Sequence, residues 1–130
     1  MRQPGDVEPT FEGISPVFPV SDIPAALAFY CESLGFDLGW AWGDPPTHAN
    51  VCRGSIDICL TLNTAIDRDV ERHAGCASIG LKGVDAYFAE LQGRNVTCGE
   101  LADRPYGMRD FAVIDPSGNR LSFGEPIAGL

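Results

Sequence analysis

The stretch PVFPVSDIPAALAFYCESLGF, residues 16–36, decides the fold, because it predicts a strand that leads directly into a helix. The strand is the apolar segment Gly13 to Val20, which Pro16 and Pro19 interrupt. Proline has no backbone N–H to donate to a sheet ladder. We therefore expect this strand to have at least one unpaired side.

A helix is predicted over the rest of this stretch. Ser21 or Asp22 can cap its N-terminus, and Pro24 lies in the first turn, where proline is tolerated. Gly35 follows at the place of a left-handed C-terminal cap. Apolar side chains recur at helical spacing along one face, at Ile23, Leu27, Tyr30 and Leu34.

Three strands are predicted after this helix. Apolar residues alternate with Asp37 and Gly39 over residues 36–42, and a Gly-Asp-Pro-Pro turn follows at residues 43–46. Residues 48–53 and 56–62 have the pattern of a hairpin around a Gly-Ser turn. The first half of the chain is therefore expected to run strand, helix and three strands.

The same order of elements restarts after a polar linker. The second half predicts a strand at Cys76–Leu81, a helix at Val84–Leu91, a strand at Val96–Leu101, and a hairpin of Phe111–Ile114 with Arg120–Phe123. The residues between the hairpin strands, Asp-Pro-Ser-Gly, are those that a β-turn demands. A repeat of this length indicates two modules that share one sheet.

These elements define one domain, preceded by a terminal arm, in a chain of 130 residues. We expect residues 1–12 to be a flexible N-terminal arm and residues 13–126 to form a single domain. Within it, module one covers about 13–63, a linker 64–74, and module two about 75–126. The expected class is α+β.

The net charge of −9 and a pI of about 4.4 indicate which partners are excluded. An acidic protein repels phosphate backbones and anionic lipids, so no nucleic acid and no membrane partner is expected. The same charge attracts cationic ligands. The alternative is that the acidity serves only solubility.

The sequence has no apolar run long enough to span a membrane and no secretory leader pattern. Its five cysteines are odd in number and lack Cys-x-x-Cys spacing, which argues against a disulfide framework and a local zinc site. A cytoplasmic location is therefore expected, with the cysteines acting as small buried apolar residues.

Together these segments resemble the glyoxalase/bleomycin resistance/dioxygenase (vicinal oxygen chelate) superfamily. Residues 16–36 resemble its first strand and helix, ASIGLKGVDAYFAEL (77–91) its second-module strand and helix, and RPYGMRDFAVIDPSGNRLSFGEP (104–126) its last hairpin. The bleomycin-resistance group is most similar, because it has comparable Pro-aromatic-Gly, Arg-acid-Phe-Ala and Asp-Pro-x-Gly-Asn motifs. The resemblance covers about residues 13–126.

The resemblance implies two βαβββ modules forming a cupped mixed sheet. It also implies a homodimer that exchanges an N-terminal segment and holds ligands in clefts between the subunits. Metalloenzymes of the superfamily hold a divalent metal with His, Glu or Gln on the first and fourth strands of each module. Counting from the matched motifs, the corresponding residues of this chain are Ser15, Cys59, Cys76 and Ser122.

This set contains no histidine and no carboxylate, so neither a metal, a cofactor nor a catalytic residue is predicted. The two histidines, His48 and His73, match no ligand position and are expected at the surface. One alternative is a lyase, isomerase or thiol transferase with atypical ligands. Another is that Cys59 and Cys76 converge to bind a soft metal or act as a thiol pair.

Aromatic residues are the remaining functional signal. Trp40 and Trp42 lie on the same face of a predicted strand, and Tyr106 is the aromatic of the Pro-aromatic-Gly motif. In the bleomycin-resistance group, aromatics at the positions of Trp40 and Tyr106 stack on the drug. Stacking and cation–π contacts suit a planar or cationic ligand. Trp40, Trp42 and Tyr106 are therefore the predicted ligand-binding residues.

The sequence thus predicts non-catalytic binding and sequestration of an antibiotic-type small molecule by a homodimer, that is, an antibiotic-resistance function. Three alternatives stay open: the metalloenzyme, a family member with no drug role, and tryptophans that pack in the core or a dimer interface. Several roles are expected to be structural. Arg109 is expected to bond an acidic neighbour or to orient its loop. The sheet core is expected to include Phe18, Phe111 and Phe123. Three carboxylates are expected to be solvated: Asp57, Glu100 and Asp110.

Overall fold

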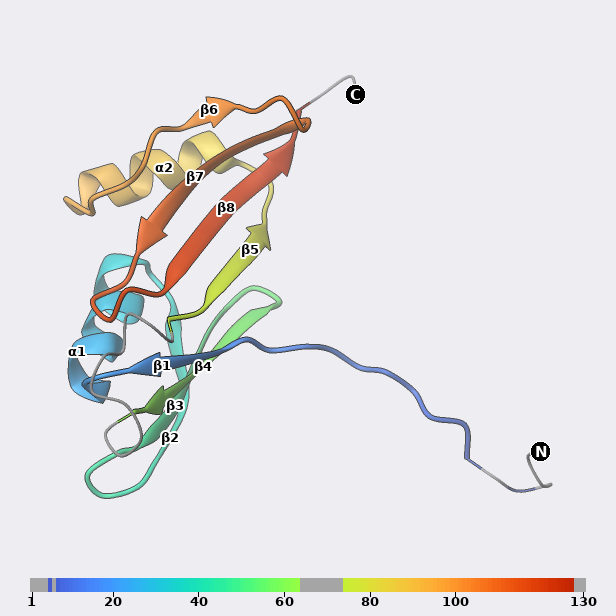
Figure 1. The fold of residues 1–130 in the computed structure, drawn as a ribbon, viewed down its shortest axis with the longest axis vertical. Coiled ribbons are helices and arrows are strands. Elements are labelled where there is room, and N and C mark those ends of the chain that lie inside the picture. The colour runs from blue at the N-terminus through green and yellow to red at the C-terminus, as the bar shows by residue number, and fades with distance from the viewer. Residues whose placement is uncertain (1–4, 6, 64–73, 128–130) are drawn as a thin grey trace.

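The structure, a computed structural model, describes residue 5, residues 7–63 and residues 74–127 (Figure 1). In chain order its elements are β1 (Val17–Val20), α1 (Ile23–Leu27), the π-helix η1 (Ala28–Ser33), β2 (Asp37–Trp42), β3 (His48–Arg53), β4 (Ile56–Leu62), β5 (Cys76–Gly80), α2 (Val84–Gly93), β6 (Ala102–Asp103), β7 (Met108–Ile114) and β8 (Arg120–Pro126). The linker predicted for residues 64–74 falls, except for Ala74, outside the described residues.

The strands form two mixed four-stranded sheets, one for each predicted module. Their orders are β1-β4-β3-β2 and β5-β8-β7-β6. In each sheet the first strand runs parallel to the last one, and the other pairs are antiparallel. The predicted α+β fold of two βαβββ modules is confirmed. The prediction that the two modules share one sheet is wrong, because the strands of each module form a hydrogen-bonded sheet of their own.

The first helix begins as predicted and then changes its winding. The Asp22 carboxylate accepts a hydrogen bond from the backbone N–H of Ala25 at 2.9 Å, and Gly35 has a φ of +76°. From residue 28 the helix is π-helical, with the N–H of Leu34 bonded to the carbonyl of Phe29. None of the described helices is long and apolar enough to cross a membrane.

The strand predicted for Val96–Leu101 is wrong. These residues are irregular, and the short strand β6 follows them. Val96 and Cys98 pack against the core while Thr97 and Gly99 are exposed, so burial alternates as it does in a strand. The N–H of Gly99 bonds to the carbonyl of Ala112 at 2.8 Å, but no regular ladder forms. Alternating burial therefore does not by itself produce a strand, because a strand also needs regular backbone pairing.

Each helix covers one face of its own sheet. Phe18, Phe111 and Phe123 are only 0–2% exposed on these covered faces, which confirms their predicted place in the core. Tyr87 of α2 packs on Phe123 with 5.0 Å between ring centroids. No helix in the described part of the chain covers the opposite face of either sheet.

A buried polar network joins the last hairpin to module one. Asp115 accepts hydrogen bonds from the backbone N–H groups of Ser117 and Asn119, from the Asn119 amide and from the hydroxyl of Tyr30. The Asn119 amide also donates to the carbonyl of Pro19. Burial and the adjacent Asp115 carboxylate raise the pKa of Tyr30. The Asp-Pro-x-Gly-Asn motif therefore works as a clamp between the modules.

A second contact between the modules centres on Glu90 of α2. The guanidinium of Arg53 donates to its carboxylate at 2.7 and 3.0 Å and lies 5.0 Å from the ring centroid of Tyr87. Arg94 donates to the same carboxylate at 2.8 Å. The hydrogen bond from Arg53 holds the pKa of Glu90 below its ordinary value.

Replacing Glu90 by glutamine is expected to lower the free energy of unfolding by about 1 kcal/mol at neutral pH, because these ion pairs are partly exposed. The folded-state pKa of Glu90 is lowered, so its contribution is fully present above the ordinary pKa of 4.5. It is lost as the pH falls through the lower folded value. Urea unfolding of both proteins from neutral to acid pH should show the difference shrinking; a difference independent of pH would contradict the assignment.

Candidate ligand-binding site

The open face of the module-one sheet carries the two tryptophans. Trp40 pairs with Asn50 and Trp42 with His48 in the ladder of β2 and β3, so both rings lie on the face of Asn50. Trp40 is 49% exposed and Trp42 67% exposed. The alternative that they pack in the core of this chain is therefore wrong. The ring of Trp42 meets His48 edge to face, at 5.7 Å.

A bulge at Gly39 sets the position of Trp40. The pairing of β2 with β3 shifts register between Leu38 and Trp40. The side chain of Asn50, only 8% exposed, lies beneath Gly39, and a Cβ at residue 39 would collide with its amide oxygen. Glycine is therefore needed for Asn50 to sit under the strand that carries the tryptophans.

Gly39→Ala is expected to destabilise the protein by about 1–3 kcal/mol, because the added methyl group must displace Asn50 or β2. It should also weaken ligand binding through the displaced Trp40. Thermal unfolding and tryptophan fluorescence measure the two effects. Gly93→Ala is the matched control, since that site at the end of α2 has open space, and its stability should not fall. If the two variants had the same stability and the same ligand affinity, the role of Gly39 would be refuted.

A polar cluster continues across the same face. Asp57 accepts hydrogen bonds from the hydroxyl of Ser15 at 2.7 Å and from the amide of Asn50 at 3.0 Å. The Asn50 amide also donates to the sulfur of Cys59 at 3.6 Å. Ser15 thus bonds to Asp57 directly, and Cys59 bonds to the Asn50 amide that also holds Asp57, a carboxylate that was expected to be solvated.

The open face of the module-two sheet is hollowed beneath Tyr106. One hollow of about 370 Å³ is lined by Ser78, Ile79, Gly80, Tyr106, Met108, Asp110, Ser122 and Gly124. An adjoining hollow of about 410 Å³ is lined by Gly99, Glu100, Arg104, Tyr106, Asp110, Ala112, Arg120 and Ser122. Tyr106, Asp110 and Ser122 line both, so the two form one surface.

Hydrogen bonds hold the ring of Tyr106 over this surface. Its hydroxyl donates to Asp110 at 2.6 Å, and Arg104 donates to the other oxygen of that carboxylate at 2.8 Å. These bonds lower the pKa of Asp110, and the bond to Asp110 raises the pKa of Tyr106. Arg109 lies apart, bonded to Asp85 and Asp103, which confirms its expected bond to an acidic neighbour.

A third cleft, which sequence reasoning missed, lies between the modules. It has a volume of about 340 Å³ and is lined by Phe36, Arg53, Ile56, Ile79, Gly80, Leu81, Lys82, Gly83, Ala86, Tyr87, Glu90 and Phe123. The cleft includes the Arg53–Glu90 contact and runs between β5 and the side of α2 that carries Ala86 and Tyr87. Because its walls come from both halves of the chain, no local motif marks it.

The residues at the superfamily's metal positions do not fit a metal ion. They supply hydroxyl and thiol groups, and the Ser15 hydroxyl already donates to Asp57. Cys76 is exposed at the start of β5, and Ser122 pairs with Ser78. Among the described residues, no three His, Cys, Asp or Glu side chains are grouped to hold a metal. His48 is exposed, and His73 lies outside the described residues.

Comparisons with known proteins agree with this architecture. The family model for the glyoxalase/bleomycin resistance protein/dioxygenase superfamily matches residues 14–123. A bleomycin resistance protein of Geobacillus stearothermophilus is 28% identical, over 86% of this chain and 95% of its own. The bleomycin-binding protein of Streptomyces verticillus, solved with copper(II)-bleomycin, is 27% identical with a TM-score of 0.74, covering 89% of this chain and 97% of its own.

An antibiotic binding protein from Streptomyces sp. CB03234 is also 27% identical, with a TM-score of 0.70, over 91% of this chain and 99% of its own. A bleomycin resistance determinant encoded on the transposon Tn5 has a TM-score of 0.76 at 16% identity, which shows the shared fold alone. Fold, motifs and family model lead to one assignment. The chain belongs to the glyoxalase/bleomycin resistance protein/dioxygenase superfamily.

Proposed function

We propose that this protein binds a planar, positively charged small molecule of the antibiotic type and sequesters it without chemical change. The observation that carries the proposal is the pair of exposed tryptophans on an open sheet face, at 49% and 67% exposure. Large aromatic side chains that gather on one exposed face often mark a ligand-binding or interaction site. The relatives named for bleomycin binding and resistance support the same function.

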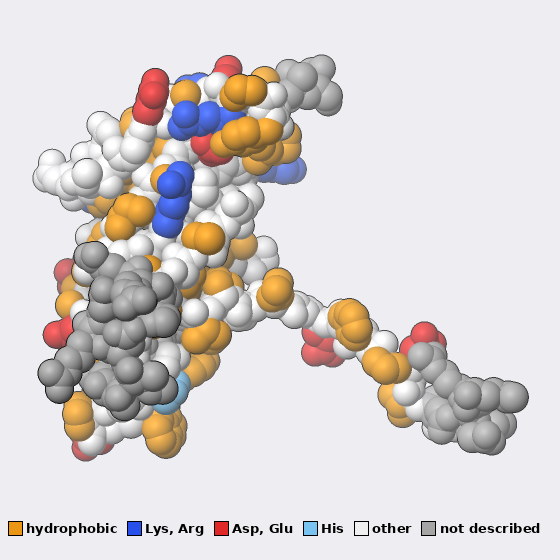
Figure 2. All heavy atoms as spheres, in the orientation of Figure 1, with side chains coloured by type: hydrophobic (Ala, Val, Ile, Leu, Met, Phe, Trp, Pro, Cys, Tyr) orange, Lys and Arg blue, Asp and Glu red, His pale blue; other side chains and the backbone are white. Residues whose placement is uncertain are grey.

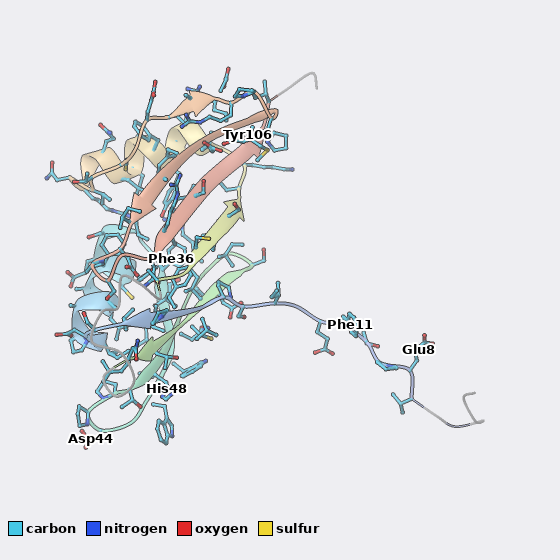
Figure 3. The ribbon with its side chains drawn as sticks, in the orientation of Figure 1. Glu8, Phe11, Phe36, Asp44, His48 and Tyr106 are labelled. Carbon is cyan, nitrogen blue, oxygen red and sulfur yellow. The ribbon has the colours of Figure 1, made fainter. Side chains whose placement is uncertain are left out.

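We propose further that the ligand cleft forms between two copies of the chain. Tyr106 and His48, which contacts Trp42, lie at opposite ends of the molecule (Figure 3). The aromatic residues of the two modules therefore cannot wall one cleft within a single chain. Two copies packed head to tail would place module one of each beside module two of the other.

The N-terminal segment supports a dimer. Residues 7–14 have no helix or strand and extend away from the body (Figure 1), and hydrophobic side chains follow this arm (Figure 2). Val7, Phe11 and Ile14 are more than 90% exposed. We propose that the arm packs on the partner subunit and buries them. Light scattering should give twice the chain mass of 13.9 kDa, and deletion of residues 1–12 should shift the protein towards monomer.

A cytoplasmic location belongs to the same proposal. All five cysteines are free in the structure, as expected in a reducing compartment.

The binding proposal is tested by titrating the purified protein with a panel of planar drugs, both cationic and neutral, and following tryptophan fluorescence. Saturable quenching by the cationic members supports it. Flat titrations across the whole panel would refute it, in protein that circular dichroism shows to be folded and light scattering shows to be dimeric.

A further inference from the structure

The carboxylate of Asp57 is anchored only by neutral groups in the part of the chain that is described. Its oxygen Oδ2 accepts from the Ser15 hydroxyl and the Asn50 amide, at 2.7 and 3.0 Å. No described Lys, Arg or His side chain forms an ion pair with it. In module two, by contrast, Asp110 is paired with Arg104 at 2.8 Å. The open face of module one therefore carries a negative charge that no cation among residues 7–63 and 74–127 neutralises.

This charge lies beside the aromatic surface. Asn50 is the residue directly opposite Trp40 in the β2–β3 ladder, and its amide reaches across to Asp57 on β4. Directly opposite residues in antiparallel strands have Cβ atoms about 5 Å apart. Asn50 on β3 thus lies between the strands of Trp40 and Asp57, β2 and β4, which are two strand spacings or about 10 Å apart. A single small molecule is large enough to touch both.

A buried side chain, Asn50, holds the Asp57 carboxylate in place. Asn50 is more than nine-tenths buried, and its amide donates to both Asp57 and Cys59. The absence of a side chain at Gly39 makes room for it. The same buried amide therefore lies under β2, the strand that carries Trp40, and fixes the position of the Asp57 carboxylate. Preorganised charge of this kind binds a ligand without the cost of ordering a flexible side chain.

We propose that Asp57 is the residue that selects the charge of the ligand, pairing with its cationic group while Trp40 stacks on its planar part. This inference rests on the proposed function and deepens it. The ligand class is a planar organic cation, such as a heteroaromatic ring with a quaternary nitrogen or an attached ammonium or amidinium group. A neutral ring of the same shape gains the stacking but not the ion pair.

The test compares two probes of nearly the same shape, N-methylacridinium, a planar cation, and N-methylacridone, which is neutral. Both are titrated into the full-length wild-type protein and the Asp57→Asn variant, with tryptophan quenching as the readout. Asparagine has the shape of aspartate and can still accept from Ser15 and Asn50. The Kd for the acridinium should rise about five- to tenfold in the variant, while that for the acridone changes less than twofold.

Glu32→Gln is the matched control, because it removes the same charge from an exposed site on η1, the helix segment that follows α1. It should leave both affinities unchanged. Unaltered acridone binding shows that the Asp57→Asn surface is intact, and Asp57→Glu should restore part of the preference for the cation. If both probes bind and Asp57→Asn leaves the ratio of their two Kd values unchanged, the role of Asp57 is refuted while the proposed function stands. If neither probe binds the wild type, the proposed function fails as well.

Discussion

Asp115→Ala is expected to lower the free energy of unfolding by about 3–5 kcal/mol, because it breaks a buried network from its centre. Asp115 is 4% exposed and accepts from two backbone N–H groups, the Asn119 amide and the Tyr30 hydroxyl. Removing the carboxylate leaves these donors buried without an acceptor. Urea unfolding at one fixed protein concentration measures the loss as a lower midpoint.

Tyr30→Phe is the graded comparison for this prediction. It removes one donor and leaves the other bonds of Asp115 in place, so about 1 kcal/mol should be lost. Asp115→Ala should therefore cost several times as much as Tyr30→Phe. If the two variants were equally stable, or if Asp115→Ala cost less than about 1 kcal/mol, the network would not be the clamp between the modules.

Trp40→Ala is expected to raise the Kd for a planar cationic ligand by at least about tenfold. Truncating a large aromatic residue at the centre of a binding surface typically costs about 2 kcal/mol or more. The side chain is half exposed in the single chain, so the protein should remain folded. Calorimetric titration measures the affinity without relying on the fluorescence of the removed residue.

Two further variants separate stacking from general loss of surface. Trp40→Phe keeps a ring and should lose less affinity than Trp40→Ala. Leu38→Ala removes an exposed apolar side chain from the same strand, on the other side of the bulge, and should leave the Kd within about twofold. Comparable losses in Trp40→Ala and Leu38→Ala would show that Trp40 has no specific contact with the ligand.

Much of the fold was predictable because the signals are local. The Asp22 cap, the left-handed Gly35 and the two-residue turn at residues 54–55 each depend on a few adjacent residues. The predicted strand at residues 96–101 failed for the opposite reason. A strand needs a partner backbone along its length, and alternating burial in the sequence does not reveal whether that partner is present.

The candidate site was predictable in part. Trp40, Trp42 and Tyr106 stand out by residue type and motif, and the structure leaves all three exposed. The link between Asp57 and Asn50 could not be found, because it depends on the register of β3 with β4 and on the bulge at Gly39. Asp57 was noticed as a carboxylate, but only its neighbours show that its charge is held in place and not paired with a described cation.

Calorimetric titration of the full-length protein with bleomycin, followed by mass spectrometry of the recovered ligand, tests non-catalytic sequestration most directly. We predict saturable binding of one ligand per chain, equal affinity with and without prior treatment of the protein with a chelator, and recovery of bleomycin with its mass unchanged. A modified product, or binding that disappears when the protein is stripped of metal, would contradict sequestration by an aromatic, acidic surface.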